Sequence, residues 1–207
     1  MSDSAFDSIS VVVLAAGNST RMGVAKQLLD FRGQPLLRHA VQTALATGCG
    51  HVVAVLGAGW QHLLPVLRGL DVEVVLNDRW AQGMGTSIQA GLNGARARDA
   101  KGVILSLADQ PFVTSESLAA LVNAHHATTK AIVASRYSET VGVPVFFARE
   151  AFPSLLALGP DQGCKGAVLT AAAADRAYLL DCPEAAIDLD TPEDYRRAVT
   201  GDYVTKL

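Results

Sequence analysis

The feature that most constrains this fold is a regular alternation of short apolar runs with helical patterns. Three β-rich apolar runs, at residues 10–16, 51–57 and 102–109, are separated by stretches whose apolar residues recur with the period of a helix. Runs that are apolar on both faces indicate strands of a parallel sheet that helices cover on two sides. We therefore predict a single doubly wound α/β domain over residues 1–207, with a mostly parallel sheet.

The same criteria place the remaining elements. Further strands are expected at 72–77, 131–137, 143–149 and 177–181, and helices at 35–48, 60–70, 85–97, 114–128, 150–158, 163–174 and 191–201. Thr114 or Ser115 is expected to cap one helix. Thr191 is expected to cap the last one, with Pro192 at its first position. Pro65 is expected to interrupt the helix over 60–70.

Composition and charge exclude several classes of protein. Half of the 207 residues are hydrophobic and 18% are charged, which argues against a disordered or fibrous chain. A net charge of −3 without a long basic run predicts no nucleic-acid partner. The three cysteines lie far apart, which favours a reducing compartment.

The first residues and the apolar runs of the chain indicate its cellular location. The first ten residues contain two aspartates and no lysine or arginine, so we expect no signal peptide and a cytoplasmic location. No apolar run approaches the roughly 18–20 residues of a membrane helix, so we expect no membrane partner. Residues 1–8 are expected to form a flexible tail before the first strand.

The loop after residue 16 carries the first candidate site, because ligands of doubly wound sheets bind at the carboxyl ends of strands. Small residues at Ala15, Ala16 and Gly17 let backbone N–H groups approach an anion closely. Arg21 offers a planar fork for phosphate oxygens, and Lys26 offers a compact charge on a long stem. The pattern suits a triphosphate, although neither standard glycine-loop motif is present. The alternative is an ordinary loop with two solvated cations.

Carboxylates supply a second part of the candidate site. Asp109 ends an apolar run, where a carboxylate near phosphates is a natural Mg²⁺ ligand. Alternatively, it turns the loop before Pro111. Asp188 and Asp190 alternate along an extended stretch, which would place both side chains on one side and let them complete a metal site with Asp109. The alternative for Asp190 is that it only precedes the last helix.

A glycine-containing loop within residues 77–92 supplies the third part. Gly83 and Gly85 precede a helix that we expect to begin near Thr86 and Ser87. Backbone groups and small hydroxyls at this point are candidates to contact the base edge or ribose of a nucleotide. The alternative is that Thr86 or Ser87 caps the helix.

Together, three segments resemble the nucleotidyltransferases of molybdenum-cofactor maturation, and they are most similar to the cytidylyltransferase branch. The segments are LAAGNSTRMGVAK at 14–26, LADQP at 107–111 and DLDTPEDY at 188–195. They keep the order of the family, and the resemblance covers nearly the whole chain. It implies a Rossmann-like, nucleotide-diphospho-sugar transferase-like fold.

The resemblance also implies roles for individual residues. The nucleotide-binding positions would be Leu14, Ala15, Ala16, Gly17, Arg21, Lys26, Gly83 and Ser87, with Thr86 as a further candidate from the loop chemistry. Lys26, Arg21 and Asp109 would act in catalysis. Asp109, together with Asp188 or Asp190 or both, would hold Mg²⁺ as the cofactor.

The substrates implied are CTP and a phosphorylated pterin. Ala16 favours CTP, because guanylyl-transferring relatives resemble L-A-G-G where this chain has L-A-A-G. The acceptor would meet Asp161, Gly163 and Lys165 in GPDQGCKGA at 159–167, where the lysine stands in place of the arginine usual in the branch. A lysine keeps the positive charge for an acceptor phosphate but loses the bidentate geometry. An apo-molybdoenzyme or its chaperone would receive the product.

The activity implied is Mg²⁺-dependent transfer of CMP from CTP to the terminal phosphate of molybdopterin, with release of pyrophosphate. One rival keeps the fold and transfers a cytidylyl or uridylyl group to a sugar or alditol phosphate. A second rival is a non-catalytic protein that binds and delivers the cofactor. The presence of Arg21, Lys26 and Asp109 counts against this second rival.

Overall fold

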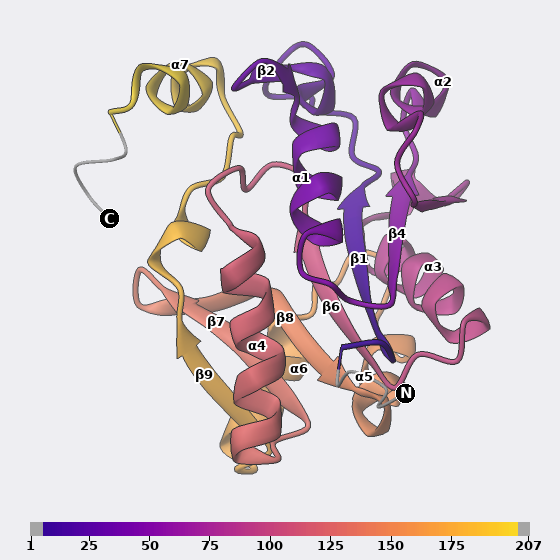
Figure 1. Ribbon diagram of the computed structural model, residues 1–207, viewed down its shortest axis with the longest axis vertical. Helices are drawn as coiled ribbons and strands as arrows, with labels where there is room; N and C mark the ends of the chain where they lie inside the picture. The colour runs from indigo at the N-terminus through magenta and orange to yellow at the C-terminus, as the bar shows by residue number, and fades with distance from the viewer. Residues whose placement is uncertain (1–5, 203–207) are drawn as a thin grey trace.

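A seven-stranded sheet in the order β5-β4-β1-β6-β8-β7-β9 forms the centre of this computed structural model, which describes residues 6–202 (Figure 1). Its strands are β1 (Ile9–Ala15), β4 (His51–Leu56), β5 (Glu73–Leu76), β6 (Gly102–Leu107), β7 (Ile132–Tyr137), β8 (Thr140–Ala148) and β9 (Ala177–Asp181). Strands β5, β4, β1 and β6 are parallel, whereas β8 runs antiparallel to both of its neighbours and β9 is parallel to β7. The prediction of a mostly parallel α/β sheet is confirmed.

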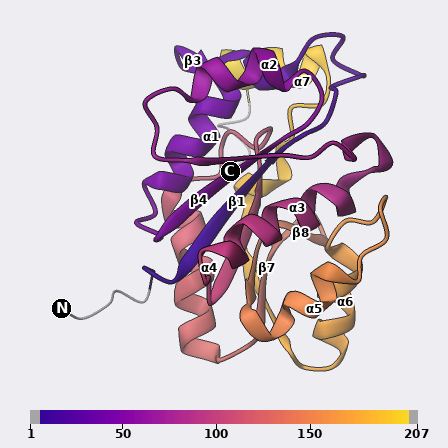
Figure 2. The ribbon, with the colours of Figure 1, turned by 90° about the vertical axis from the view of Figure 1, so that its right-hand side faces the viewer.

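Helices cover both faces of this sheet. They are α1 (Leu36–Leu45), α2 (Trp60–Leu63), α3 (Met84–Ala97), α4 (Ser115–Thr128), α5 (Phe152–Leu156), α6 (Lys165–Ala173) and α7 (Pro192–Thr200). Helices α1, α2 and α4 pack on one face, and α3, α5 and α6 pack on the other (Figure 2). The sheet is therefore buried between two helical layers, as its two-sided apolar strands predicted.

Strand β1 shows why those strands are apolar throughout. Val11 and Val13 belong to the core cluster beneath α1 and α4, whereas Val12 and Leu14 belong to the cluster beneath α3. Successive side chains of a strand point to opposite faces, so a strand covered on both sides has no polar face. Residues 11–13 are completely buried.

The C-terminal part of the chain forms a third, smaller cluster. Its buried members are Phe31, Leu36, Ile187, Leu189 and Ala198, which join α7 to the short hairpin of β2 (Asp30–Phe31) and β3 (Gln34–Pro35). The hydroxyl of Tyr195 in α7 donates to the carbonyl of Asp30 at 2.7 Å. No strand was predicted at this hairpin from the sequence.

Several helix ends agree with the predicted capping signals. The hydroxyls of Thr114 and Thr191 each accept a hydrogen bond from a backbone N–H in the first turn of their helices. Pro65 lies in a 3₁₀ turn that follows the single turn of α2, which confirms the expected interruption. In contrast, α3 begins at Met84 with Gly83 as its N-cap and without a side-chain cap, so the alternative of capping by Thr86 or Ser87 is wrong.

The segment predicted as a flexible tail is partly described. Residues 1–5 lie outside the described residues. Phe6 accepts backbone hydrogen bonds from Ile9 and Gly50, and Ser8 accepts one from Lys101. Residues 6–8 are therefore joined to the sheet, which corrects the expectation for this part of the segment. Between residues 6 and 202, no helix is both long enough and apolar enough to span a membrane.

The three cysteines are unpaired. Burial raises the pKa of Cys164 to about 11, and burial followed by the nearby charge of Glu184 raises the pKa of Cys182 to about 11. Both thiols therefore stay protonated near neutral pH, and their thiolates are unavailable for chemistry. Cys164, which is 5% exposed, is therefore a packed core residue.

The close packing of α3 on the sheet can be tested by substitution of Gly91. A Cβ at this position would lie 2.3 Å from Val12 Cγ1 and 2.8 Å from Val55 Cγ2. We expect Gly91→Ala to destabilise the protein by about 1–3 kcal/mol through overpacking, although alanine is the better helix former. Urea unfolding measures the loss. The control is Gly166→Ala in α6, where a Cβ meets nothing within 4 Å. Equal effects of the two substitutions would contradict the close packing.

Candidate functional site

The candidate site is a cavity of about 490 Å³ at the carboxyl ends of β1 and β6. These neighbouring strands mark the point where the strand order reverses, with β4 on one side of β1 and β6 on the other. Crevices at such points are the usual ligand sites of doubly wound sheets. The predicted site residues that line the cavity are Leu14, Ala15, Ala16, Gly17, Lys26, Gly83, Ser87 and Asp109.

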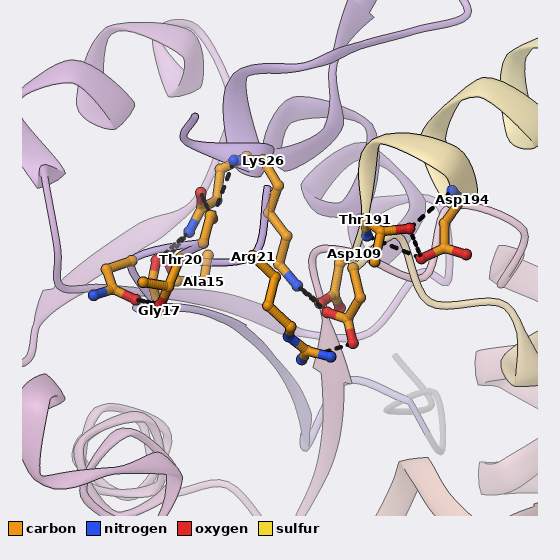
Figure 3. A network of polar contacts seen from close by, with 12 residues as sticks. Ala15, Gly17, Thr20, Arg21, Lys26, Asp109, Thr191 and Asp194 are labelled. Carbon is orange, nitrogen blue, oxygen red and sulfur yellow. Dashed lines mark hydrogen bonds and ion pairs between the residues drawn. The ribbon is translucent and has the colours of Figure 1, made fainter. Parts of the chain in front are cut away.

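Lys26 joins three distant parts of the chain at the edge of this cavity. Its Nζ donates to Asp109 Oδ2 and, at 3.0 Å, to Asp190 Oδ1 (Figure 3). The side chains of Lys26 and Asp109 are only 18% and 15% exposed. Burial alone lowers the pKa of Lys26, but the charges and hydrogen bonds of the two aspartates outweigh burial and raise it. The ammonium group therefore stays charged.

Arg21 contacts one of these carboxylates, that of Asp190, from the solvent side. Its guanidinium lies 2.9 Å from Asp190 Oδ2, and its side chain is 72% exposed. An ion pair this exposed contributes little to stability, because water competes for both charges. Arg21 is therefore free to exchange Asp190 for another anion at small cost.

The backbone explains how the C-terminal carboxylates reach Asp109. The N–H of Leu189 donates to the carbonyl of Asp109 at 2.9 Å, and the Leu189 side chain is completely buried in the third cluster. Asp188 and Asp190 flank this anchored residue. The structure thus places Asp188 and Asp190 near enough to Asp109 for the charges of the three carboxylates to interact.

Asp188 experiences the negative charge of this group. Its pKa is raised to about 6, by desolvation of the carboxyl and then by the charges of Asp109 and Asp190. Its neighbours therefore oppose ionisation of Asp188 unless more positive charge is nearby.

The donor set suits a divalent cation, although the geometry is not that of a formed metal site. In the part of the chain that the structure describes, no three His, Cys, Asp or Glu side chains are grouped closely enough to hold a metal ion. Asp109 Oδ1 is nevertheless buried without a hydrogen-bond partner. A buried carboxylate oxygen beside two further carboxylates is the kind of ligand that Mg²⁺ and Mn²⁺ prefer.

A second loop, residues 159–162, packs against the start of α3. A Cβ on Gly85 would lie 2.1 Å from the carbonyl oxygen of Gly159, and a Cβ on Gly83 would lie 2.6 Å from the Cα of Asp161. Both positions require glycine because the backbone of residues 159–162 packs directly on them. The N–H of Gly85 also donates to the carbonyl of Pro160 at 2.9 Å.

Thr86 and Ser87 have different positions. Ser87 lines the cavity, as expected. The hydroxyl of Thr86 lies 2.8 Å from the carbonyl oxygen of Gly83 and accepts a hydrogen bond from Asn77 Nδ2. Thr86 is buried and does not line the cavity, so the expected contact with a nucleotide is not supported by this geometry. Its hydroxyl instead holds the first turn of α3.

The residues expected to contact the acceptor lie beside the cavity rather than in its wall. None of Asp161, Gly163 and Lys165 lines it. Lys165 Nζ donates to Thr140 Oγ1 at 2.6 Å. Their loop reaches the cavity through its packing on Gly83 and Gly85 and through Gly163, where a Cβ would lie 3.5 Å from the sulfur of the cavity residue Met84.

Seven cavity residues were not predicted from the sequence: Asn18, Gln27, Trp80, Ala81, Met84, Leu107 and Ala108. Gln27 directly follows Lys26, and Trp80 follows the strand predicted at 72–77, so their places along the chain were a signal. Met84 is 46% exposed although it begins a helix whose other face is buried. An exposed methionine and a tryptophan beside small residues give the cavity apolar walls that suit a flat aromatic group.

Comparison with known proteins matches the chain to one family model. The model of the MobA-like NTP transferase domain matches residues 11–176. The purine catabolism protein PucB of Bacillus subtilis is 28% identical over 204 residues, which cover 91% of this chain and 96% of that protein. The nicotine blue oxidoreductase of Paenarthrobacter nicotinovorans is 35% identical over 126 residues. That match spans 60% of this chain and 61% of the relative, less than two thirds of its length.

Solved structures agree with this match. The crystal structure of Rv0371c from Mycobacterium tuberculosis has a TM-score of 0.74 and 32% identity, covering 93% of this chain and 97% of that one. A second structure of Rv0371c, in complex with manganese, has a TM-score of 0.71 and 30% identity, with 93% and 98% of the two chains covered.

Lys26→Met tests the ion pairs at the cavity edge. The substitution leaves the mostly buried carboxylate of Asp109 without its lysine, so we expect a loss of about 1–3 kcal/mol in the free energy of unfolding. Adding Asp109→Asn should recover part of this loss by removing the uncompensated charge. Lys130→Met is the control, because Lys130 pairs with the 93% exposed Asp175. Urea unfolding at constant pH measures all variants, and equal losses at Lys26 and Lys130 would refute the assignment.

Proposed function

The chain belongs to the MobA-like NTP transferase family, and from this membership we propose that it transfers CMP from CTP to the terminal phosphate of a molybdopterin-type acceptor. As a nucleotidyltransferase of this type, it would release pyrophosphate. The observation that carries the proposal is the meeting of Lys26, Asp109 and Asp190 at the edge of the cavity. This arrangement places a protonated lysine and a set of carboxylates beside a loop of small residues.

The reaction needs positioning and charge neutralisation more than proton transfer. A terminal phosphate oxygen of the acceptor attacks the α-phosphorus of CTP, and the bond from that phosphorus to the oxygen bridging to the β-phosphate breaks. The electron pair leaves with pyrophosphate. The attacking oxygen is already anionic, so no strong general base is required. Lys26 and Arg21 would neutralise the charge that develops on the α-phosphate and on the pyrophosphate.

A divalent cation fits the carboxylates in this proposal. Asp109, with Asp188 or Asp190 or both, would hold Mg²⁺, which supplies positive charge to the phosphates when bound. The unpartnered Asp109 Oδ1 and the raised pKa of Asp188 support this set of residues. The manganese complex of the relative Rv0371c also supports a divalent ion. Lys26 and Arg21 would then exchange their aspartate partners for phosphate oxygens.

The nucleotide would lie in the cavity with its base between apolar walls. Leu14 and the backbone of residues 15–17 would follow the phosphates and ribose. Gly83 and Ser87 would face the base, with Trp80 and Met84 as further walls. Ala16 would favour CTP, as the similarity to L-A-A-G relatives implies, and its position is fixed because it is only 5% exposed and its carbonyl accepts from the N–H of Ala58 at 3.0 Å.

The acceptor side of the proposal rests on the loop beside α6. Asp161, Gly163 and Lys165 would approach the acceptor, with the exposed Lys165 ammonium meeting a phosphate. The product would pass to an apo-molybdoenzyme or its chaperone. An acceptor held by a lysine rather than by an arginine fork also suits the rival acceptors, the sugar and alditol phosphates.

Pyrophosphate release distinguishes these possibilities. The purified protein is incubated with Mg²⁺, each of the four NTPs, and molybdopterin, a sugar phosphate or an alditol phosphate as acceptor. Release that requires both CTP and molybdopterin supports the proposal. Release with a sugar or alditol phosphate supports the rival transferase. Saturable binding of CTP without release for any acceptor supports a delivery protein and contradicts catalysis.

Removing either partner of the Lys26–Asp109 pair tests the catalytic roles. We expect Lys26→Ala and Asp109→Ala each to lower turnover by about 100-fold or more, the scale of one preorganised electrostatic partner. The controls are Lys101→Ala and Asp99→Ala, which break the exposed ion pairs of Asp99 with Lys101 and Arg149 on another part of the surface. Circular dichroism checks that all four variants are folded. Near-normal turnover of Asp109→Ala would refute the metal-binding role of this carboxylate.

Ala16→Gly tests base selection. Removing the Ala16 methyl group should relax the cavity beside the base and lower the ratio of kcat/KM for CTP over GTP by about tenfold. Steady-state pyrophosphate release with the two nucleotides measures this ratio. Ala58→Gly, on the neighbouring loop, is the control for a general loosening of the backbone. An unchanged ratio for Ala16→Gly would show that base selection depends on other residues.

A further inference from the structure

Gln27 is a buried polar residue in the floor of the candidate site, and the sequence analysis gave it no role. It is 3% exposed, and it lines the cavity. We propose that Gln27 is a positioning residue that sets the backbone of loop 15–19 for binding a triphosphate. This inference rests on the proposed function in taking that loop as the phosphate-binding loop.

The carboxamide of Gln27 bonds to this loop three times. Its Nε2 donates to the carbonyl of Ala15 at 3.1 Å and to the carbonyl of Gly17 at 2.7 Å. Its Oε1 accepts from the hydroxyl of Ser19 at 3.1 Å. Figure 3 shows Ala15 and Gly17 at one end of the polar network that also contains Lys26. Both amide hydrogens and the amide oxygen are therefore used on one short loop.

These bonds fix the direction of two peptide planes. In a trans peptide unit, the carbonyl and the following N–H point in opposite directions. Turning the carbonyls of Ala15 and Gly17 toward Gln27 therefore turns the N–H groups of Ala16 and Asn18 away from it. Ala16 and Asn18 both line the cavity. A Cβ on Gly17 would meet nothing within 4 Å, so the backbone between them is open to an approaching anion.

Ser19 connects the same bonds to Lys26. Its hydroxyl donates to Gln27 Oε1 and accepts from the N–H of Lys26 at 3.1 Å. Ser19 has a left-handed φ of 55°, which a residue other than glycine adopts at some cost. The bonds from Gln27 and Lys26 hold this conformation. The peptide N–H groups of the loop and the base of the Lys26 side chain are thus positioned together.

Only a neutral amide satisfies this set of partners. The two loop carbonyls need donors and the Ser19 hydroxyl needs an acceptor, which Gln27 supplies from one planar group. A methionine of similar size supplies neither, and a glutamate would place oxygens against two carbonyls. A packing role alone would tolerate methionine, so this substitution separates packing from positioning.

The experiment compares Gln27→Met with Gln89→Met as its matched control. Gln89 Nε2 also donates to two backbone carbonyls, that of Leu156 at the end of α5 and that of Leu158, but Gln89 does not line the cavity. The probes are CTP with Mg²⁺ and inorganic tripolyphosphate, titrated by calorimetry into each whole protein. The Cα and Cβ chemical shifts of Ser19 report its left-handed conformation without ligand.

We expect Gln27→Met to weaken CTP and tripolyphosphate by the same factor, about tenfold or more, and to shift the Ser19 signals. Gln89→Met should change none of these. In pyrophosphate release, Gln27→Met should raise the KM for CTP and leave the KM for the acceptor unchanged. Ser19→Ala, at a half-buried position, should weaken the binding of CTP and tripolyphosphate by a smaller factor. It replaces Gln27→Met as the test if that variant does not fold.

Three results would overturn the inference. They are unchanged affinity and Ser19 shifts in Gln27→Met, equal losses in Gln89→Met, or a loss for CTP with none for tripolyphosphate. The proposed function can fail separately. A wild-type protein that binds tripolyphosphate through Gln27 but transfers no nucleotide would refute the function and leave the role of Gln27 standing. A wild-type protein that binds neither probe would refute that role as well.

Discussion

The ion pairs of Lys26 with Asp109 and Asp190 are the interactions on which the arrangement of the site depends. They bring together a loop near the N-terminus, the end of the central strand β6 and the segment before the last helix. The lysine and its closest partner are mostly buried, so water screens their attraction only weakly. Three carboxylates share this corner with two cations, and desolvation, followed by the charges of Asp109 and Asp190, raises the pKa of Asp188. A bound metal–triphosphate complex would replace these ion pairs, because the cations would bind phosphate oxygens and the carboxylates would bind the metal.

The rest of the fold keeps these charges at the cavity. Leu189 anchors the C-terminal segment twice, through its N–H to the carbonyl of Asp109 and through its buried side chain. On the opposite wall of the cavity, the loop at 159–162 packs on the backbone of Gly83 and Gly85 at the start of α3. The cavity is therefore bounded by backbone contacts as well as by side chains. Such contacts are less free to move than side chains, which favours a preorganised site.

The local structure could be predicted well from particular residues. The fully apolar 11–13 stretch indicated a strand covered on both faces, and Thr114 and Thr191 marked the starts of two helices. The start of α3 was predicted less well. Thr86 and Ser87 are typical capping residues, but the loop at 159–162 reaches Gly83 and Gly85 and lets the helix begin at Met84. A contact between residues so far apart along the chain leaves no local pattern.

The sequence by itself determined which stretches have the apolar periodicity of a helix or a strand, and the order of the chemical groups along the chain. Small residues before Arg21 and Lys26, and carboxylates at 109, 188 and 190, can be recognised without coordinates, because residue type and spacing are local properties. Only the tertiary structure decided which groups meet. It pairs Lys26 with Asp109, 83 positions further along the chain. It also bonds the Thr86 hydroxyl to the carbonyl of Gly83, and it places the Gln27 carboxamide against the carbonyls of Ala15 and Gly17. Hydrogen-bonding partners depend on the packing of distant segments, and spacing along one chain does not specify that packing.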